Sequence, residues 1–328
     1  MSNQIQQKNR IPSPDGPEIL GEVLERRTEY AKEFRRADGS RLMVLYPDPV
    51  HYRQGGRWQD IDNRLVEALD DDGAAVFTNR AGAMAVRLPR RFAPGAPITL
   101  THRGYRLRYR MEGDFPARAA RTSLRDRQLP HTAQVDSTLY FPDVFPQVDV
   151  SYTLHANELK EAIRLKARPD TAPVFTFQVE APGLAPFLQP DGSLFFRPQG
   201  APEDEPVFVF PAPFLVDARG ERSDDVQVEV NGDGEGLTLV YAPCFDWLQQ
   251  PGRAFPVIMD PVVRPSLSIN NIQDQQEDSN KNDVSHTSAY IECGRHTTYG
   301  IERIYMRYNE LPALTAADVV VAVGKGEV

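Results

Sequence analysis

Short runs of alternating apolar and polar residues follow one another along most of this chain, and turn residues separate them. The run at 105–111, YRLRYRM, alternates strictly, so its tyrosines, Leu107 and Met111 share one face of an extended strand and its arginines share the other. Antiparallel sheets commonly bury one face and leave the other in water, so we expect these arginines on a solvated outer face rather than bound to an acidic polymer. Further strands are predicted at residues 41–46, 76–78, 84–88, 98–101, 149–154, 163–166, 174–179, 193–197, 207–210, 226–230 and 237–241.

Two segments depart from this alternation. In residues 19–36 a helix competes with a strand, because Ile19, Val23, Arg27 and Ala31 follow a four-residue spacing, although the apolar stripe is weak. The sequence ADGS at 37–40 is a turn signal, which predicts a hairpin leading into the strand at 41–46. Residues 116–134 contain many arginines and little periodicity, so we expect a long exposed connection there.

Prolines and glycines interrupt the chain too often for helices of ordinary length. The sequence contains 28 prolines and 22 glycines, and strands do not alternate with helices as they do in parallel sheets. We therefore expect an all-β fold: an antiparallel β-sandwich-like N-terminal domain followed by an incomplete second β-sandwich. The predicted division is a flexible tail at 1–18, a β-rich domain at 19–264 and a partial sandwich at 265–328, which begins with a polar stretch.

The last of these segments offers few strands. The visible candidates are residues 289–292, 303–308 and 319–323. Because so few strands can cover one another, the run VVVAV at 319–323 is expected to lack a partner strand, and to exchange its amide hydrogens quickly or promote self-association.

Composition excludes several classes of protein. Hydrophobic residues make up 41% of the 328 positions and charged residues 25%, which are ordinary values for a folded chain and exclude disorder throughout. The formal net charge of −9 disfavours a general phosphate-binding surface, so nucleic acid is not expected as a partner. The apolar run near the C-terminus is far shorter than the roughly 20 residues of a membrane helix, so no membrane span is expected.

Motifs for catalysis or cofactor binding are absent from the sequence. The run GDGEG at 232–236 lies between two predicted strands, so it is expected to form a hairpin turn rather than a phosphate-binding loop, which must open a helix. No nucleophile elbow, zinc-binding helix or lysine-bearing phosphate loop occurs, and the six histidines show no metal-ligand spacing. Cys244 and Cys293 are expected to be two separate buried thiols. We therefore predict no catalytic residue, no cofactor and no metal site, and expect that the chain is not an enzyme.

Acidic residues provide the alternative to this interpretation. Asp60 and Asp62 would lie roughly 7 Å apart on one face of a strand, where they could share a cation or act as an acid and base pair. The simpler interpretation is that both aspartates and Asn63 hydrogen-bond backbone groups at a strand end. If the alternative holds, Asp60, Asp62 or Glu161 would act in a groove between sheets of a polysaccharide hydrolase or lyase, with two carboxylates in one cleft.

Several segments together resemble a known bacterial family. They are RRTEYAK at 26–32, YPDPVHY at 46–52, GRWQDIDN at 56–63, FPDVFPQVDVSYTL at 141–154, ELKEAIRLK at 158–166, FPAPFLVDARGERSDDVQVEV at 210–230 and FPVIMDPVV at 255–263. In order and spacing they resemble the N-terminal region of YD-repeat proteins of the Rhs or wall-associated protein A type, a group that includes polymorphic toxins. The likeness covers about residues 22–263.

The remainder of the chain, 266–328, resembles the beginning of a DNRLRE-type carbohydrate-binding β-sandwich, and RIYMRYNELP at 303–312 carries that likeness. The family resemblance implies a structural or adhesive segment of a large bacterial surface or secreted protein, with glycan binding by the second sandwich. Its implied partners are downstream parts of the same polypeptide and a cell-wall or extracellular polysaccharide. The resemblance also implies an extracellular or cell-surface location, although a cytoplasmic location stays open because no signal peptide is recognisable, and toxin activity is not carried over.

Overall fold

The computed structural model describes residues 17–201, 205–260, 262–265, 272–278, 284–285, 294–296, 300–308 and 318–322. Strands account for 56% of the structure and helices for 3%, and the sheets are antiparallel. The all-β expectation is therefore confirmed. Contacts divide the chain into two compact units: one contains Tyr46–Ser266, and the other combines Pro17–Leu45 with Leu267–Val321.

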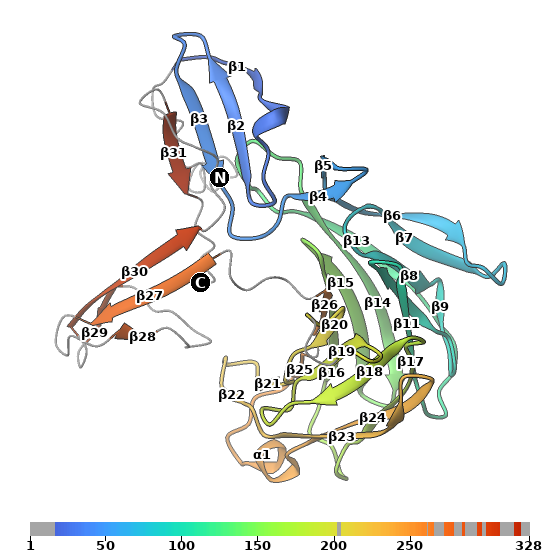
Figure 1. The fold of residues 1–328 in the computed structure, drawn as a ribbon. Helices are drawn as coiled ribbons and strands as arrows, with labels where there is room; N and C mark the ends of the chain where they lie inside the picture. The colour runs from blue at the N-terminus through green and yellow to red at the C-terminus, as the bar shows by residue number, and fades with distance from the viewer. Residues whose placement is uncertain are drawn as a thin grey trace, which may run out of the picture. The chain divides into compact units, whose positions relative to one another are not determined.

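The first unit is built from two large sheets (Figure 1). The eight-stranded sheet contains, in spatial order, β23 (Val226–Asp233), β24 (Gly236–Pro243), β17 (Phe175–Glu180), β11 (Tyr105–Met111), β10 (Ile98–His102), β8 (Ala85–Pro89), β7 (Ala75–Ala81) and β6 (Asp62–Leu69). The eleven-stranded sheet follows the path β13 (Arg121–Asp126), β14 (Val135–Phe145), β15 (Val148–His155), β16 (Glu158–Leu165), β26 (Val262–Pro265), β20 (Phe208–Phe210), β19 (Leu194–Pro198) and β18 (Leu184–Leu188), with β21 (Leu215–Val216), β22 (Arg222–Ser223) and β25 (Val257–Met259) beside it.

Smaller elements complete the first unit. They are the hairpin of β4 (His51–Gln54) and β5 (Arg57–Asp60), the pair of β9 (Arg91–Phe92) and β12 (Arg118–Ala119), and the helix α1 (Phe245–Gln249).

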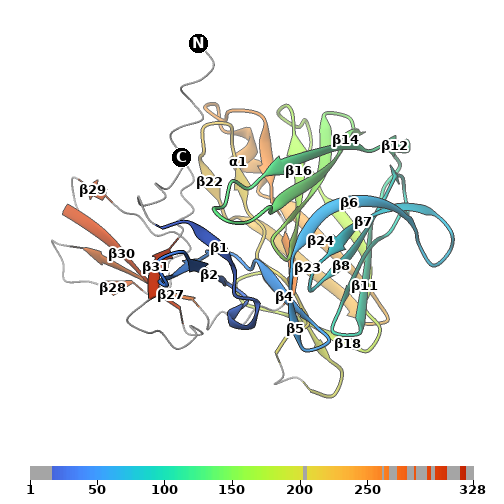
Figure 2. The ribbon, with the colours of Figure 1, turned by 90° about the horizontal axis from the view of Figure 1, so that it is seen from above.

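The core of this unit lies between the two large sheets, because each contributes an apolar face. Figure 2 shows β14 and β16 in one layer and β8, β11 and β24 in the other. The ring of Tyr109 on β11 meets the ring of Phe210 on β20 edge to face, with centroids 6.0 Å apart, so aromatic contacts join the sheets. The arginines between the apolar residues of β11 face outward and pair with acidic residues: Arg106 lies 3.0 Å from Asp71, and Arg110 lies 2.7 Å from Glu180. The arginines of β11 therefore lie on the outer face of the sheet, as the strict alternation predicts.

The two large sheets also meet at both of their ends. β14, the neighbour of β13, contacts β6 at one end, and β18 contacts β23 at the other. The terminal strands β13 and β23 therefore belong to opposite ends of the unit, as Figure 1 shows.

The second unit contains two four-stranded sheets. One has the order β1 (Ile19–Glu22), β2 (Ala31–Arg36), β3 (Arg41–Leu45) and β31 (Asp318–Ala322), and the short 3-10 helix η1 (Leu24–Arg26) connects β1 to β2. The other has the order β28 (Val284–Ser285), β27 (Ile272–Asp278), β30 (Gly300–Tyr308) and β29 (Gly294–His296).

Three sequence expectations have outcomes in this second unit. Strands form most of the segment where a helix competed, and the predicted hairpin at 37–40 is confirmed, with the Ser40 amide donating to the Asp38 carboxylate at 2.9 Å. The expectation that 319–323 lacks a partner is wrong for its described part, because β31 lies beside β3. The candidate strand at 289–292 lies outside the described residues. The division at residues 18 and 264 stays a prediction, because contacts within one chain do not establish which segments fold alone.

The expected long connection at 116–134 is also wrong. The segment contains β12 and β13, and β13 pairs with β14 in a register that runs from Arg121 opposite Tyr140 to Asp126 opposite Val135. All six residues of β13 are exposed, so neither face of the strand is buried. A strand without a buried face has no apolar alternation, which explains why the sequence pattern did not reveal it.

The run at 232–236 is a turn between two strands, as predicted. β23 and β24 form a hairpin whose last residue pair is Asp233 and Gly236. Gly232 has φ +115°, and an added Cβ would lie 2.4 Å from the carbonyl oxygen of Gly236, so this close approach requires glycine. Cys244 is half-buried rather than fully buried, and Cys293 lies outside the described residues.

Candidate functional site

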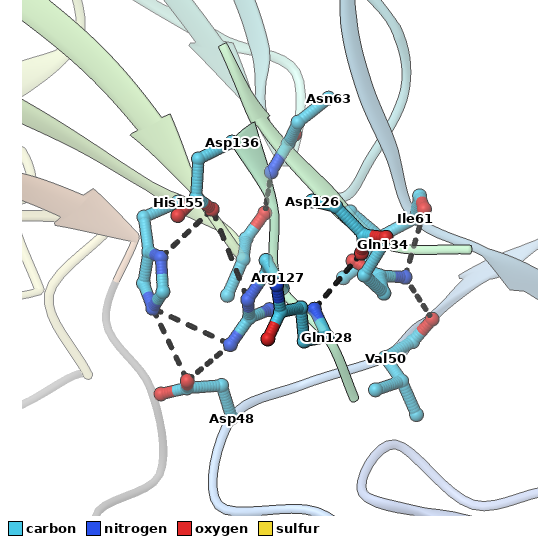
Figure 3. Close-up of polar contacts among 11 residues, drawn as sticks. Asp48, Val50, Ile61, Asn63, Asp126, Arg127, Gln128, Gln134, Asp136 and His155 are labelled. Carbon is cyan, nitrogen blue, oxygen red and sulfur yellow. Dashed lines mark hydrogen bonds and ion pairs between the residues drawn. The ribbon is translucent and has the colours of Figure 1, made fainter. Parts of the chain in front are cut away.

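Four charged side chains from separate segments converge at one corner of the first unit (Figure 3). Asp136 on β14 and His155 at the end of β15 are brought together by the β14–β15 ladder, in which the neighbouring pair is Ser137 and Leu154. Arg127 directly follows β13, and Asp48 precedes β4. The strand register thus places two of these residues, and the loops beside the strands supply the others.

His155 is held by a carboxylate on each ring nitrogen. Its Nδ1 lies 2.9 Å from Asp136 Oδ1, and its Nε2 lies 3.1 Å from Asp48 Oδ2. The guanidinium of Arg127 donates to Asp48 through Nη2, and its Nε lies 3.8 Å from Asp136 Oδ1. The Arg127 side chain is only 3% exposed, so this charge is neutralised inside the protein rather than by water.

The electrostatic balance of this cluster favours the imidazolium form. Burial lowers the pKa of His155, but the hydrogen bonds to Asp136 and Asp48 outweigh burial, and the net pKa lies above its usual value of 6.5. An imidazolium donates from both nitrogens, which matches two carboxylate partners. His155 in this form has no lone pair available for accepting a proton or binding a metal ion. These four side chains, Asp48, Arg127, Asp136 and His155, therefore form an ion-paired joint between segments of the first unit.

Neighbouring polar contacts extend this joint. The Gln134 amide donates to the carbonyl oxygens of Val50 at 3.2 Å and Ile61 at 2.8 Å (Figure 3). The Asn63 amide donates to the carbonyl oxygen of Ala156 at 2.7 Å. Buried side-chain amides thus fasten the segment that contains β4 and β5 to the eleven-stranded sheet.

A second unusual group lies in the core. Glu161 on β16 accepts a hydrogen bond from the hydroxyl of Tyr152, which lies opposite it on β15, at 2.6 Å. Burial raises the pKa of Glu161 to about 8, and the Tyr152 hydrogen bond lowers it only in part. The charge of Glu161 in turn raises the pKa of Tyr109 and Tyr241 on the other sheet, beyond the larger effect of their burial. The hydroxyl of Tyr109 is buried, and the described part of the chain gives it no hydrogen-bond partner.

The carboxylates of the hydrolase alternative occupy different environments. Asp60 ends β5, where Oδ1 lies 3.6 Å from His51 Nε2. Asp62 begins β6 in a different sheet, pairs with Arg64 at 2.5 Å and Arg80 at 3.6 Å, and accepts from the Arg64 amide. Glu161 is in the core. Hydrogen bonding at a strand end, the simpler interpretation, describes Asp62 and Asn63.

Sequence reasoning did not identify the residues of the corner cluster. Asp48 and His155 are 107 positions apart, and Asp48 and Arg127 are 79 apart, so no local spacing links them. The only available signal was the resemblance, since YPDPVHY contains Asp48 and FPDVFPQVDVSYTL ends one residue before His155. In the part of the chain that the structure describes, no group of three or more His, Cys, Asp or Glu residues could hold a metal ion.

Comparisons with known proteins add relatives to this picture. No family model matches the chain, and no solved structure matches it. The chain is 28% identical over 310 residues to the tRNA3(Ser)-specific nuclease WapA of Bacillus spizizenii, and 27% identical to the tRNA(Glu)-specific nuclease WapA of Bacillus subtilis subsp. natto. Each alignment covers 89% of this chain and 13% of the relative. The chain is also 24% identical over 214 residues to the wall-associated protein of Geobacillus stearothermophilus, an alignment that covers 63% of this chain and 79% of that protein.

These relatives support one expectation and correct another. The resemblance to the wall-associated, YD-repeat group is supported by relatives of that name across most of the chain, whereas the DNRLRE-type module stays a prediction. The expectation that the chain is not an enzyme is contradicted, because three relatives are named as tRNA nucleases. The chain spans 13% of the length of those relatives. None of the helices in the described part of the chain has the length and apolar character of a membrane-spanning segment.

Proposed function

We propose that this chain is a structural and adhesive segment of a large bacterial surface or secreted protein of the YD-repeat type. The observation that carries the proposal is the alignment with WapA proteins over 89% of the chain and with a wall-associated protein over 63%. The second alignment covers 79% of that relative, so the name "wall-associated" belongs to a protein composed mainly of the aligned region.

The construction of the first unit supports a mechanical role. Two sheets share one apolar core, which extends across residues from both of them. The ion-paired joint around His155 and the hydrogen bonds donated by the Gln134 side-chain amide fix the β4–β5 segment to the eleven-stranded sheet. Buried polar groups that are paired in this way hold one arrangement of the backbone, since breaking a pair leaves an unsatisfied group in the interior.

The finer part of the proposal is the ligand, a polysaccharide or glycopolymer of the bacterial cell wall. Its support is the name of the Geobacillus relative and the resemblance of the C-terminal segment to a carbohydrate-binding module. A location at the cell surface or outside the cell follows from the same proposal.

Co-sedimentation of the purified chain with isolated Gram-positive cell walls tests this function. We expect the folded chain to pellet with the walls and soluble wall glycan to compete it off. A globular protein of similar size and net charge provides the control for nonspecific retention. If the chain stays in the supernatant like this control protein, wall binding is excluded.

The names of three relatives favour a second candidate function, the cleavage of tRNA. Incubation of the chain with total tRNA, followed by separation of the fragments on a denaturing gel, tests this candidate directly. Site-specific fragments that increase with the amount of protein would support it, and intact tRNA at all amounts would oppose it. The expectation that nucleic acid is not a partner stays a prediction until that measurement.

A further inference from the structure

Three arginines lie along the outer face of the segment that runs from β12 into β13. The Ala120 side chain packs against the apolar core, so its neighbour Arg121 points to the opposite, outer face. Arg125 is four residues further along the same strand and therefore shares that face. Arg91 on β9, the partner of β12, precedes the fully buried Phe92, so its side chain also points outward. We call these three residues the arginine row.

The arginine row extends along the direction of the strand. The ladder between β12 and β9 places Arg91 opposite Ala119. The Ala120 amide continues this ladder toward β13, because it donates at 3.0 Å to the backbone carbonyl that precedes β9. Since an antiparallel strand rises about 3.4 Å per residue, Arg91 lies roughly 7 Å along the strand before Arg121, and Arg125 lies roughly 13 Å beyond it. A row of this length suits a linear ligand better than a single ion.

The three arginines are exposed, and they make no ion pair within the part of the chain that the structure describes. Outward arginines on β11 are neutralised instead, since Arg106 pairs with Asp71 and Arg110 pairs with Glu180. Acidic residues outnumber lysine and arginine in this chain by 46 to 37, so a shortage of carboxylates does not explain the unpaired row. The row therefore offers three positive charges to a ligand.

Two carboxylates beside Arg125 do not neutralise it. Asp136, which lies opposite Arg125 on β14, belongs to the ion-paired joint, where two carboxylates balance one guanidinium and one imidazolium. Asp126 lies on the other face of β13 and accepts from the Gln128 amide at 2.8 Å. The arginine row thus keeps a local positive charge, although the whole chain carries a formal net charge of −9.

We propose that the arginine row binds a linear anionic polymer of the cell wall whose units are joined by phosphodiester linkages. This inference rests on the proposed function and gives its ligand a chemistry and a place on the fold. Guanidinium groups suit phosphate oxygens, because their planar fork donates two parallel hydrogen bonds. Nucleic acid is a poorer match. A duplex carries one charge per about 1.7 Å, so three arginines neutralise few of its phosphates, and the net charge of −9 repels the others.

Fluorescence anisotropy of labelled poly(glycerol phosphate), titrated with the full chain, tests the site. If each arginine of the row neutralises one phosphate, raising the salt from about 50 to about 200 mM should weaken binding by up to about 20-fold. The variant R121Q/R125Q keeps one of these contacts, so it should bind at least about tenfold more weakly at the lower salt. Its affinity should then fall only about threefold over the same range of salt.

The matched control is R103Q/R219Q, which removes two exposed arginines from the β10–β11 and β21–β22 turns and should bind like the unaltered chain. Circular dichroism confirms that each variant is folded before the comparison. Failure of the unaltered chain to bind the labelled polymer would overturn the proposal, and so would an R121Q/R125Q variant that binds it equally well. Displacement of the polymer by less single-stranded RNA than unlabelled poly(glycerol phosphate) would assign the row to nucleic acid and overturn the proposal too.

Pelleting with isolated Gram-positive walls separates this inference from the proposed function. The unaltered chain should bind intact walls and lose most of this binding after hydrofluoric acid has removed the phosphodiester polymers. R121Q/R125Q should lose most of its binding to intact walls, whereas R103Q/R219Q should keep it. Equal retention on intact and treated walls would leave wall binding in place and overturn the anionic ligand. Absence of the chain from both pellets would overturn the proposed function and this inference together.

Discussion

Glu161 makes the stability of the first unit depend on pH, and replacement of this residue with glutamine measures that dependence. The side chain is 3% exposed, and burial raises its pKa from the ordinary value of 4.5 to about 8. The folded chain therefore keeps this carboxyl neutral up to about pH 8, whereas the unfolded chain ionises it near 4.5. The amide of glutamine preserves an oxygen that can accept from Tyr152 and has no proton to lose.

The sign and size of the effect follow from these two pKa values. Because the folded state binds the proton more tightly, the favourable contribution is fully present below pH 4.5 and is lost as the pH rises through about 8. The two values differ by 8 − 4.5 = 3.5, and each pKa unit corresponds to about 1.4 kcal/mol. The loss is therefore on the order of 5 kcal/mol, an upper bound because the core can relax around a charge.

Urea titrations of the unaltered chain and Glu161→Gln at about pH 5 and about pH 9 provide the measurement. We expect the two proteins to differ little in the free energy of unfolding at the lower pH, and the variant to be more stable by a few kcal/mol at the higher pH. Glu112→Gln, which removes one exposed carboxylate, is the matched control and should follow the unaltered chain. If Glu161→Gln and the unaltered chain lose stability in parallel, Glu161 does not titrate in the folded state and the reasoning fails.

Three other changes test separate parts of the structure. Gly234→Ala should destabilise the β23–β24 hairpin strongly, because the added Cβ would lie 1.7 Å from the carbonyl oxygen of Leu184. Gly236→Ala has open space around its Cβ and should change the free energy of unfolding by less than about 1 kcal/mol. Equal melting temperatures for the two variants in thermal denaturation would contradict this. His155→Gln should lower the free energy of unfolding below about pH 6.5, and this loss should shrink as the pH rises through the raised pKa of the histidine. Urea titrations that give the same loss at every pH would count against the ion-paired joint. Tyr46→Phe should lose about 1 kcal/mol, because its hydroxyl donates at 2.7 Å to a backbone carbonyl 84 positions away, and an unchanged urea midpoint would show that this bond contributes nothing.

The strands that sequence reasoning found are those with one buried face. β11 matches its predicted bounds at both ends, and its apolar residues enter the core while its arginines face outward. β15, β17 and β24 alternate buried and half-buried residues in the same way along most of their length. In such strands burial alternates from one residue to the next, because successive side chains point to opposite faces of the sheet. The alternation of apolar and polar residues in the sequence therefore reveals the strand.

Contacts between segments that are far apart in the sequence are not indicated by any such local pattern. The aspartates around His155 come from a loop and a neighbouring strand, and each looks like an ordinary surface residue in its own segment. The partner of β31 was equally hidden, because β3 lies far away in the sequence and nothing in the run VVVAV specifies it. Such contacts depend on the topology of the whole chain, which local patterns do not contain.

Burial does not hold the edge strand β13 in place, because all six of its residues are exposed. Its ladder with β14 fixes one side of the backbone, and Arg127, directly after its last residue, is anchored by Asp48 and Asp136. The same cluster contains His155, whose charge balances these aspartates. These ion pairs, rather than burial, therefore hold the end of β13 in the first unit.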